Sequence, residues 1–399
     1  MQKMKNLGNG VSYIGMDDLT LDLFEGQYIL PEGVSYNSYL IDDEKIAVLD
    51  TVDARCGDAW FEEISAVLGD RTPDFLVVHH LEPDHSGMIA EFIRRYPSAR
   101  IVAGAKALQM LPQFLPEDML LSGDSLCSVA EGDVLDLGSH KLKFISAPMV
   151  HWPEVMMSYD LSDGVFYSAD AFGKFGALGK CGFYGSEDEE WTCEARRYYF
   201  NIVGKYGAPA KLVLEKAKKL DIKTVCALHG PILQGELLAE ALRLYTIWTG
   251  YGVETEGVFV VYGSLHGNTA KAAEKLVEIL QAKGCPKVAC ADLSEEDFHE
   301  CIEDAFRYGR VIFAAPTYEG GVFPKMEQLL THLAHKCWQG KKVGLVENGS
   351  WAPAAARTMR AALERMKDIT IVEPSVTIKG ALKTSDISAL EALADAILA

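Results

Sequence analysis

The chain has 399 residues, of which 49% are hydrophobic and 24% are charged, and its formal net charge is −19 at pH 7. The length indicates two or three domains, and the composition is typical of a folded globular protein rather than a disordered one. No block of lysines or arginines offsets the negative charge, so a nucleic acid backbone would be repelled and is excluded as an expected partner.

The sequence predicts neither a membrane span nor a signal peptide. No apolar run approaches the roughly 18 to 20 residues that a membrane-spanning helix needs, and residues 1–15 lack the apolar centre of a signal peptide. The nine cysteines form no CxxC pair, which excludes a built-in rubredoxin or iron–sulfur centre and fits thiols that are kept reduced. We therefore expect a cytoplasmic protein that has no membrane partner.

The first half of the chain is rich in short strands. Helices are expected at 58–69 and 87–97, and amphipathic helices follow at 187–206, 209–220 and 235–249, around one strand at 224–230. This mixture favours two sheets sandwiched between helices. The earlier strands are expected at 34–41, 45–51, 75–80, 100–105, 141–147, 155–161 and 164–172.

The second half alternates strands and helices regularly. A linker at 251–257 precedes five such units, which predict a doubly wound, parallel, five-stranded sheet. We therefore place two domains at 1–251 and 252–399. The strands are expected at 258–264, 287–293, 310–318, 341–350 and 369–378, and the helices at 268–283, 295–306, 322–336, 352–367 and 384–398.

Metal-binding side chains crowd into HHLEPDH at 79–85, directly after an apolar run. Because side chains of an extended segment alternate in direction, His80, Glu82 and Asp84 should point one way and His79 the other. A turn into the following helix would swing His85 back towards them. A lone histidine or aspartate here would more often be a solvated polar residue at a strand end.

Three further polar residues follow apolar runs in the same way. His151, Asp170 and His229 each come at the end of an expected strand, and strand ends on one edge of a sheet converge in space. The recurrence favours one metal site assembled from distant loops. Other histidines lack this setting and are expected to be surface or packing residues, namely His140, His299, His332 and His335.

This pattern of HxExDH with distant His, Asp and His resembles the metallo-β-lactamase superfamily and, more closely, the flavodiiron proteins. The resemblance implies that His80, Glu82 and His151 bind one iron and that Asp84, His85 and His229 bind a second. It implies that Asp170 bridges the two. Three carboxylates suit non-haem iron, although ligand type alone does not decide between iron and zinc.

A second pattern in the C-terminal half indicates a phosphate-binding loop. VVYGSLHGNT runs from a strand into a helix start, where backbone amides and hydroxyls can surround one phosphate, whereas GxxxxGK[ST] and GxGxxG are both absent. This half resembles short-chain flavodoxins, which bind FMN. The residues expected to contact FMN are Ser264, Leu265, His266, Gly267, Asn268, Thr269, Pro316, Thr317, Tyr318, Glu319, Gly320, Gly321, Asn348, Gly349, Ser350 and Trp351.

Together the two halves are similar to the flavodiiron architecture, a metallo-β-lactamase-like αββα sandwich followed by a flavodoxin-like domain. The resemblance implies an oxidoreductase that reduces dioxygen to water, nitric oxide to nitrous oxide, or both, with FMN and two non-haem irons joined by an oxo or hydroxo bridge. It also implies a rubredoxin or rubredoxin-like donor and a head-to-tail homodimer or a dimer of dimers. Some archaeal relatives instead accept hydride from a reduced deazaflavin.

Aromatic residues near the metal motif suggest an apolar pocket that admits gas and limits water. Trp152 directly follows His151, and Tyr199, Phe200 and Tyr206 lie in a nearby expected helix. Two other functions stay open. One is a dizinc hydrolase fused to a flavodoxin-like electron-transfer domain, which Glu82 disfavours because such hydrolases mostly have a histidine there. The other is a flavin-binding module with a structural metal, although such sites are usually four-coordinate.

Overall fold

The computed structural model describes residues 5–119, 121 and 123–399, and the chain divides into two compact units. The first contains the residues up to Tyr199 together with Ala208–Thr246, and the second contains Phe200–Gly207 and Ile247–Ala399. A short stretch of the predicted 187–206 helix therefore packs with the second unit. The predicted domain limits of 1–251 and 252–399 remain predictions.

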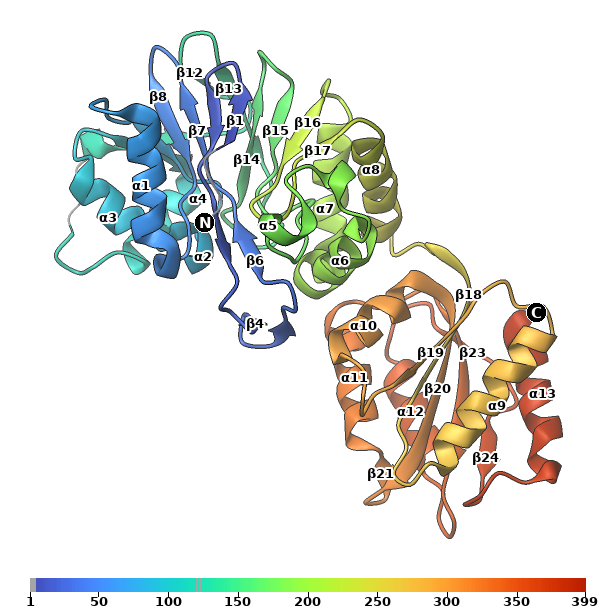
Figure 1. Cartoon of the computed structure of the whole chain (residues 1–399). Helices are drawn as coiled ribbons and strands as arrows, with labels where there is room; N and C mark the ends of the chain where they lie inside the picture. The colour runs from blue at the N-terminus through green and yellow to red at the C-terminus, as the bar shows by residue number, and fades with distance from the viewer. Residues whose placement is uncertain (1–4, 120, 122) are drawn as a thin grey trace. The chain divides into compact units, whose positions relative to one another are not determined.

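The first unit contains two sheets that face each other (Figure 1). The first sheet has the order β1-β2-β7-β8-β9-β10-β11, and its last four strands are parallel. The second has the order β12-β13-β14-β15-β16-β17, in which only β15 and β16 are parallel. The strands of the first sheet are β1 (Lys5–Gly8), β2 (Val11–Tyr13), β7 (Tyr39–Asp42), β8 (Ile46–Leu49), β9 (Phe75–Val77), β10 (Arg100–Gly104) and β11 (Leu126–Val129). Those of the second are β12 (Val134–Asp136), β13 (Lys141–Ser146), β14 (Met156–Asp160), β15 (Val165–Tyr167), β16 (Thr224–Cys226) and β17 (Leu233–Gln234).

Helices cover the outer faces of these sheets, as the sequence predicts for an αββα sandwich. Figure 1 shows α1 and α3 outside the first sheet and α7 and α8 outside the second. Apolar side chains from the inner faces of both sheets share one buried core, in which Val77 and Val102 meet Phe144 and Tyr167. The helices are α1 (Gly57–Leu68), α2 (Pro83–Ser86), α3 (Ile89–Arg95), α4 (Ala105–Met110), α5 (Leu178–Cys181), α6 (Trp191–Tyr198), α7 (Gly207–Ala217) and α8 (Gly235–Thr249).

Two predicted elements of this unit are interrupted. The predicted strand 34–41 is divided into β6 (Val34–Tyr36), which pairs with β3 (Met16–Asp18), and β7, which belongs to the first sheet. Buried Asn37 lies between these two strands, and its side-chain amide donates hydrogen bonds to the carbonyls of Ala227 and Gly230. A second short pair, β4 (Leu23–Phe24) and β5 (Tyr28–Ile29), precedes β6. After α6, the helical run continues as a π-helix at Tyr199–Val203 and a 3₁₀ turn at Gly204–Tyr206.

The second unit is a doubly wound sheet with the strand order β19-β18-β20-β22-β23, in which all these strands are parallel. Figure 1 shows α9 and α13 on one face and α10, α11 and α12 on the other. Its strands are β18 (Thr255–Tyr262), β19 (Val288–Asp292), β20 (Tyr308–Tyr318), β21 (Gly321–Val322), β22 (Lys342–Asn348), β23 (Thr370–Ile371) and β24 (Val376–Ile378). Its helices are α9 (Asn268–Ala282), α10 (Phe298–Arg307), α11 (Pro324–His335), α12 (Ala355–Leu363) and α13 (Thr384–Leu398).

The fifth predicted strand, 369–378, is wrong as one continuous element. It is split into β23 and β24, which pair with different parts of β22. Pro374 lies between them, and proline has no N–H to donate to a sheet ladder. No helix among the residues that the structure describes has both the length and the apolar character needed to cross a membrane.

Candidate metal and flavin sites

Loops and one short helix at one edge of the first unit carry all seven predicted metal ligands. The segment with His80 and Glu82 follows β9 and leads into α2, which holds Asp84 and His85. In the second sheet β13, β15 and β16 run in the same direction, so the loops after them leave from one edge. These loops supply His151, Asp170 and His229. The predicted convergence of strand ends explains how residues up to 149 positions apart meet, from His80 to His229.

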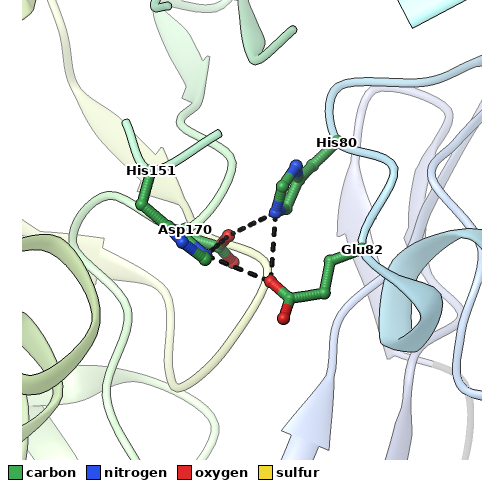
Figure 2. Close-up of side chains that lie close together, drawn as sticks. All are labelled: His80, Glu82, His151 and Asp170. Atoms are coloured by element: carbon green, nitrogen blue, oxygen red, sulfur yellow. Dashed lines mark hydrogen bonds and ion pairs between the residues drawn. The ribbon is translucent and has the colours of Figure 1, made fainter. Parts of the chain in front are cut away.

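The first group of donors contains His80, Glu82, His151 and Asp170 (Figure 2). Nε2 of His80 lies 3.2 Å from a carboxylate oxygen of Glu82 and 3.2 Å from Oδ2 of Asp170. Nε2 of His151 lies 3.1 Å from the same Glu82 oxygen and 3.3 Å from the same Asp170 oxygen. The four donor atoms therefore surround one common point.

The second group contains Asp84, His85 and His229. Nε2 of His85 lies 3.4 Å from Oδ2 of Asp84 and 3.0 Å from Nε2 of His229. Oδ1 of Asp170 lies 3.3 Å from the His85 nitrogen and 3.6 Å from the His229 nitrogen. Asp170 thus presents one carboxylate oxygen to each group, which is the arrangement of a carboxylate that bridges two cations.

The chemistry of these donors fits metal ions. Both carboxylate oxygens of Asp84 and of Asp170 are buried and have no hydrogen-bond partner among the described residues. Nδ1 of His229 lies 2.7 Å from the carbonyl oxygen of Ser35, so Nδ1 donates to this carbonyl and Nε2 points at the carboxylates. Lone pairs and buried anions that face one another without donors require a cation between them.

In the metal-free protein, protons take the place of that cation. Burial would lower the pKa of His151, but Asp170 and Glu82 raise it to about 9. Burial would likewise raise the pKa of Asp170, but the charges of His80 and of the other facing histidines lower it well below its usual value. The Asp170 carboxylate is therefore ionised at neutral pH and available to metal.

Two supporting residues have no signal in the sequence motif. Glu154 accepts the backbone N–H of Leu81 at 3.0 Å and lies 2.8 Å from Nδ1 of His80. The Ser35 carbonyl holds His229 in the same way. Both fix the ring orientation of a predicted ligand. The only sequence hint for Glu154 is its position three residues after His151.

Side-chain alternation agrees with the directions of His79 and His80 but not with that of Asp84. His79 points away from the donors and bonds to Asp50 and to Ser158, whereas His80 points at them. The extended segment ends before Pro83, however, and Asp84 lies in the first turn of α2. Its approach to the site comes from this helical turn and not from strand alternation.

Aromatic rings surround the donors, and Trp152 is the one among them that the sequence analysis names. Trp152 contacts the His80 ring edge-on at a centroid distance of 5.2 Å, and Tyr198 lies 5.6 Å from the His229 ring. Phe24, from the β4–β5 hairpin, lies 5.3 Å from the same ring. Of the other predicted rings, Tyr199 packs against Tyr245 within the first unit, and Phe200 stacks on Phe306 within the second.

The second unit contains a cavity of about 570 Å³ at the carboxyl ends of β18, β20 and β22. Of the sixteen residues predicted to contact FMN, fourteen line it, and Gly267 and Gly321 do not. Ala352 and Gly380 line it as well and were not predicted. Gly380 exchanges two hydrogen bonds with the side chain of Asn348, which links the loop after β24 to the end of β22.

The loop between β18 and α9 has the features of a phosphate site. Gly267 occupies the N-cap of α9 with a φ of +82°, a conformation that favours glycine, and provides no side-chain cap. The hydroxyl of Ser264 accepts the N–H groups of Gly267 and Ala270, and Thr269 is buried in the first turn. The positive end of a helix dipole therefore faces the cavity. Trp351 is 93% exposed beside it, so a flat ring has an aromatic face available for stacking.

Comparisons with known families match both units. The family model described as ODP family beta lactamase matches residues 34–230, and the model described as flavodoxin domain matches residues 259–393. These ranges contain every predicted metal ligand and every predicted flavin contact.

Several curated proteins are similar over most of the chain. A coenzyme F420H2 oxidase of Methanothermobacter marburgensis is 31% identical over 82% of this chain and 81% of its own length. An anaerobic nitric oxide reductase flavorubredoxin of Vibrio vulnificus is 27% identical over 89% of this chain and 72% of its own. A putative diflavin flavoprotein A 1 of Nostoc is 29% identical over 91% of this chain, which spans only 61% of that longer protein.

Solved structures share the fold. The rubredoxin oxygen:oxidoreductase from Desulfovibrio gigas superposes with a TM-score of 0.91 at 24% identity, covering 99% of this chain and 98% of its own. The match extends over both units and supports the two-domain architecture read from the sequence.

Proposed function

Because the chain belongs to the flavodiiron protein family, whose cofactors are FMN and a diiron centre, we propose that it reduces dioxygen to water, nitric oxide to nitrous oxide, or both. The observation that carries the proposal is the pair of donor groups that share Asp170. Two cations held side by side offer adjacent coordination positions for a diatomic gas.

In this proposal His80, Glu82 and His151 bind one iron, and Asp84, His85 and His229 bind the second. Asp170 binds both. His85 is included because its Nε2 points at Asp170 and Asp84 and not at solvent. When bound, the irons and FMN supply the redox chemistry.

The protein's own contribution is charge balance, positioning and exclusion of water. Three carboxylates offset the charge of two metal ions in a largely buried site, where each interaction is stronger than in water. Trp152, packed on the His80 ring, limits the water that reaches the gas. In the other unit the α9 N-terminus and Thr269 hold the FMN phosphate, and Trp351 covers the ring.

We infer that electrons come from a separate carrier, a rubredoxin or rubredoxin-like protein. The name of the Methanothermobacter relative makes a reduced deazaflavin the second donor to test. We also propose a head-to-tail homodimer, in which the flavin of one subunit serves the irons of the other.

Cofactor analysis followed by gas assays tests this function. We expect about two irons and about one FMN per chain in protein purified without oxygen, and anaerobic consumption of dioxygen or nitric oxide with a reduced donor. The relative rates with the two gases decide the preference. Two zinc ions per chain, with no gas reduction after reconstitution with iron, would contradict the proposal.

A further inference from the structure

We propose that Glu154 makes the two metal positions unequal, so that the position between His80 and His151 binds its metal more tightly than the position between His85 and His229. The inference rests on the ligand assignment proposed above and goes beyond it. It predicts that metal fills the position between His80 and His151 first, which does not follow from the identity of the ligands alone.

Glu154 is a buried anion committed to the first position. Its side chain is fully buried, and one oxygen both accepts the N–H of Leu81 and lies 2.8 Å from Nδ1 of His80. The second oxygen has no hydrogen-bond partner among the described residues. Its negative charge is therefore offset mainly through the imidazole of His80 and through the cation that this imidazole would bind.

A carboxylate behind a ligand histidine acts on the metal through the ring. The carboxylate accepts the Nδ1 proton, fixes the tautomer that leaves Nε2 free, and increases the electron density that Nε2 donates. In the structure Nε2 of His80 points at Glu82 and Asp170, so this effect is directed into the first donor group.

At the second position, no carboxylate of the described residues is hydrogen-bonded to the Nδ1 atom of a ligand histidine. Nδ1 of His229 faces the neutral carbonyl of Ser35 at 2.7 Å. Nδ1 of His85 is buried and has no hydrogen-bond partner within the part of the chain that the structure describes. Neither ring therefore has, among the described residues, a hydrogen bond to a carboxylate like the one between His80 and Glu154.

The position of the shared carboxylate points the same way. Each metal position has three donors of its own and shares Asp170 with the other. Asp170 lies slightly closer to the histidine nitrogens of the first group, at 3.2 and 3.3 Å, than to those of the second, at 3.3 and 3.6 Å. The placement of Asp170 and the basicity of His80 therefore both favour the first position.

The test begins with the full-length protein, freed of metal and loaded anaerobically with one equivalent of ⁵⁷Fe²⁺. Mössbauer spectroscopy should give one dominant quadrupole doublet, and a second doublet should grow only with the second equivalent. Removal by graded chelators should release iron in two separate steps. Equal population of two doublets at one equivalent would overturn the proposal without any variant.

The Glu154→Gln variant then tests whether Glu154 causes the difference in affinity between the two metal positions. The amide can still accept hydrogen bonds but carries no charge, so we expect the affinity of the tighter position to fall by about 10- to 100-fold and the two steps to merge. Asp160→Asn is the matched control. The Asp160 carboxylate is hydrogen-bonded to Nδ1 of buried His140, and this histidine–carboxylate pair belongs to neither donor group. The control variant should leave both iron affinities unchanged.

The outcomes separate this inference from the proposed function. Retention of two distinct steps in Glu154→Gln would overturn the role of Glu154. Equal loss of iron affinity in Glu154→Gln and Asp160→Asn would also overturn it, because the effect would then be general destabilisation. Failure of the wild-type protein to bind any iron would instead contradict the proposed ligands.

Discussion

In the proposed ligand assignment, Asp170 is the residue that joins the two metal positions. Its side chain is buried, both oxygens lack hydrogen-bond partners among the described residues, and one oxygen faces each donor group. Removing it would leave two clusters of imidazoles and carboxylates without a common ligand.

We predict that Asp170→Ala lowers gas reduction by about 100-fold or more, as removal of a key electrostatic group commonly does. Bound iron should fall below two per chain, whereas FMN content should be unchanged because the flavin residues lie in the second unit. Metal analysis, flavin absorbance and anaerobic gas consumption measure the three quantities. Asp163→Ala, in the turn before β15, is the control and should keep full turnover.

The His140–Asp160 pair predicts how the stability of the folded protein depends on pH. His140 is buried, and its two ring nitrogens face the Asp160 carboxylate and the carbonyl of Asn9, so both nitrogens donate and the ring is charged. The hydrogen bond to Asp160 raises the pKa of His140 to about 9, against burial, with a further contribution from Asp163. Asp43, which accepts the His140 backbone N–H, adds negative charge nearby.

Because the folded-state pKa lies above the unfolded value of about 6.5, the stabilisation is fully present below pH 6.5 and is lost as pH rises through 9. We expect the melting temperature of the wild-type protein to fall between pH 7 and 10 more steeply than that of Asp160→Asn. Parallel curves for the two proteins over this range would show that His140 is neutral in the folded state.

The side chains that the structure brings together carry local signals in the sequence, whereas the residues that support them do not. Alternation favoured His80 over His79, and placement after apolar runs singled out His151, Asp170 and His229, because both signals lie in a few consecutive residues. Glu154 and Ser35 touch the rings of His80 and His229 through the fold alone. Such contacts join segments that share no motif.

At the level of elements, the N-terminus of α9 is the feature that matters most for the flavin. The helix begins at a left-handed glycine, has a hydroxyl in its first turn and opens into the cavity. A phosphate placed there would accept hydrogen bonds from amides that the helix itself leaves unpaired.

Thr269→Val tests this assignment. Loss of one hydrogen bond to a charged phosphate, worth about 1.5 to 3 kcal/mol, should weaken FMN binding by about 10- to 100-fold. Iron content should not change. Thr358→Val is the matched control, because the Thr358 hydroxyl bonds to the Ala354 carbonyl near the start of α12 and is absent from the cavity lining. FMN titration of flavin-free protein, followed by fluorescence, measures both variants.

Element boundaries show where local patterns stop being informative. The predicted helix 384–398 agrees with α13, whose period and flanking loop are regular. The predicted strands 34–41 and 369–378 are each two strands, because Asn37 bonds to a distant loop and Pro374 interrupts the ladder. A proline is a local signal that could have been used, whereas the partners of Asn37 lie 190 and 193 residues away.

For the whole molecule, function depends on whether the FMN of one chain passes electrons to the metal pair of the same chain or to that of its partner. Iron and FMN are held in separate compact units, and the proposed dimer makes their cooperation a property of two chains. A mixture of two inactive chains can distinguish this arrangement from transfer within one chain, because each chain can be disabled at one cofactor only.

We predict that mixing Asp170→Ala chains with Ser264→Ala/Thr269→Val chains restores activity. After random exchange of subunits, half of the twofold dimers contain one chain of each kind. With electron transfer between subunits, each of these dimers has one working flavin–metal pair instead of the two in the wild-type dimer, so about a quarter of wild-type activity should return. Each variant alone should stay inactive, and separately tagged chains allow the mixed dimer to be purified and counted. Each mixed dimer contains one intact flavin site and one intact metal site, on different chains. If such dimers do not reduce gas, electrons pass only within a single chain, because neither chain then has both an intact flavin site and an intact metal site.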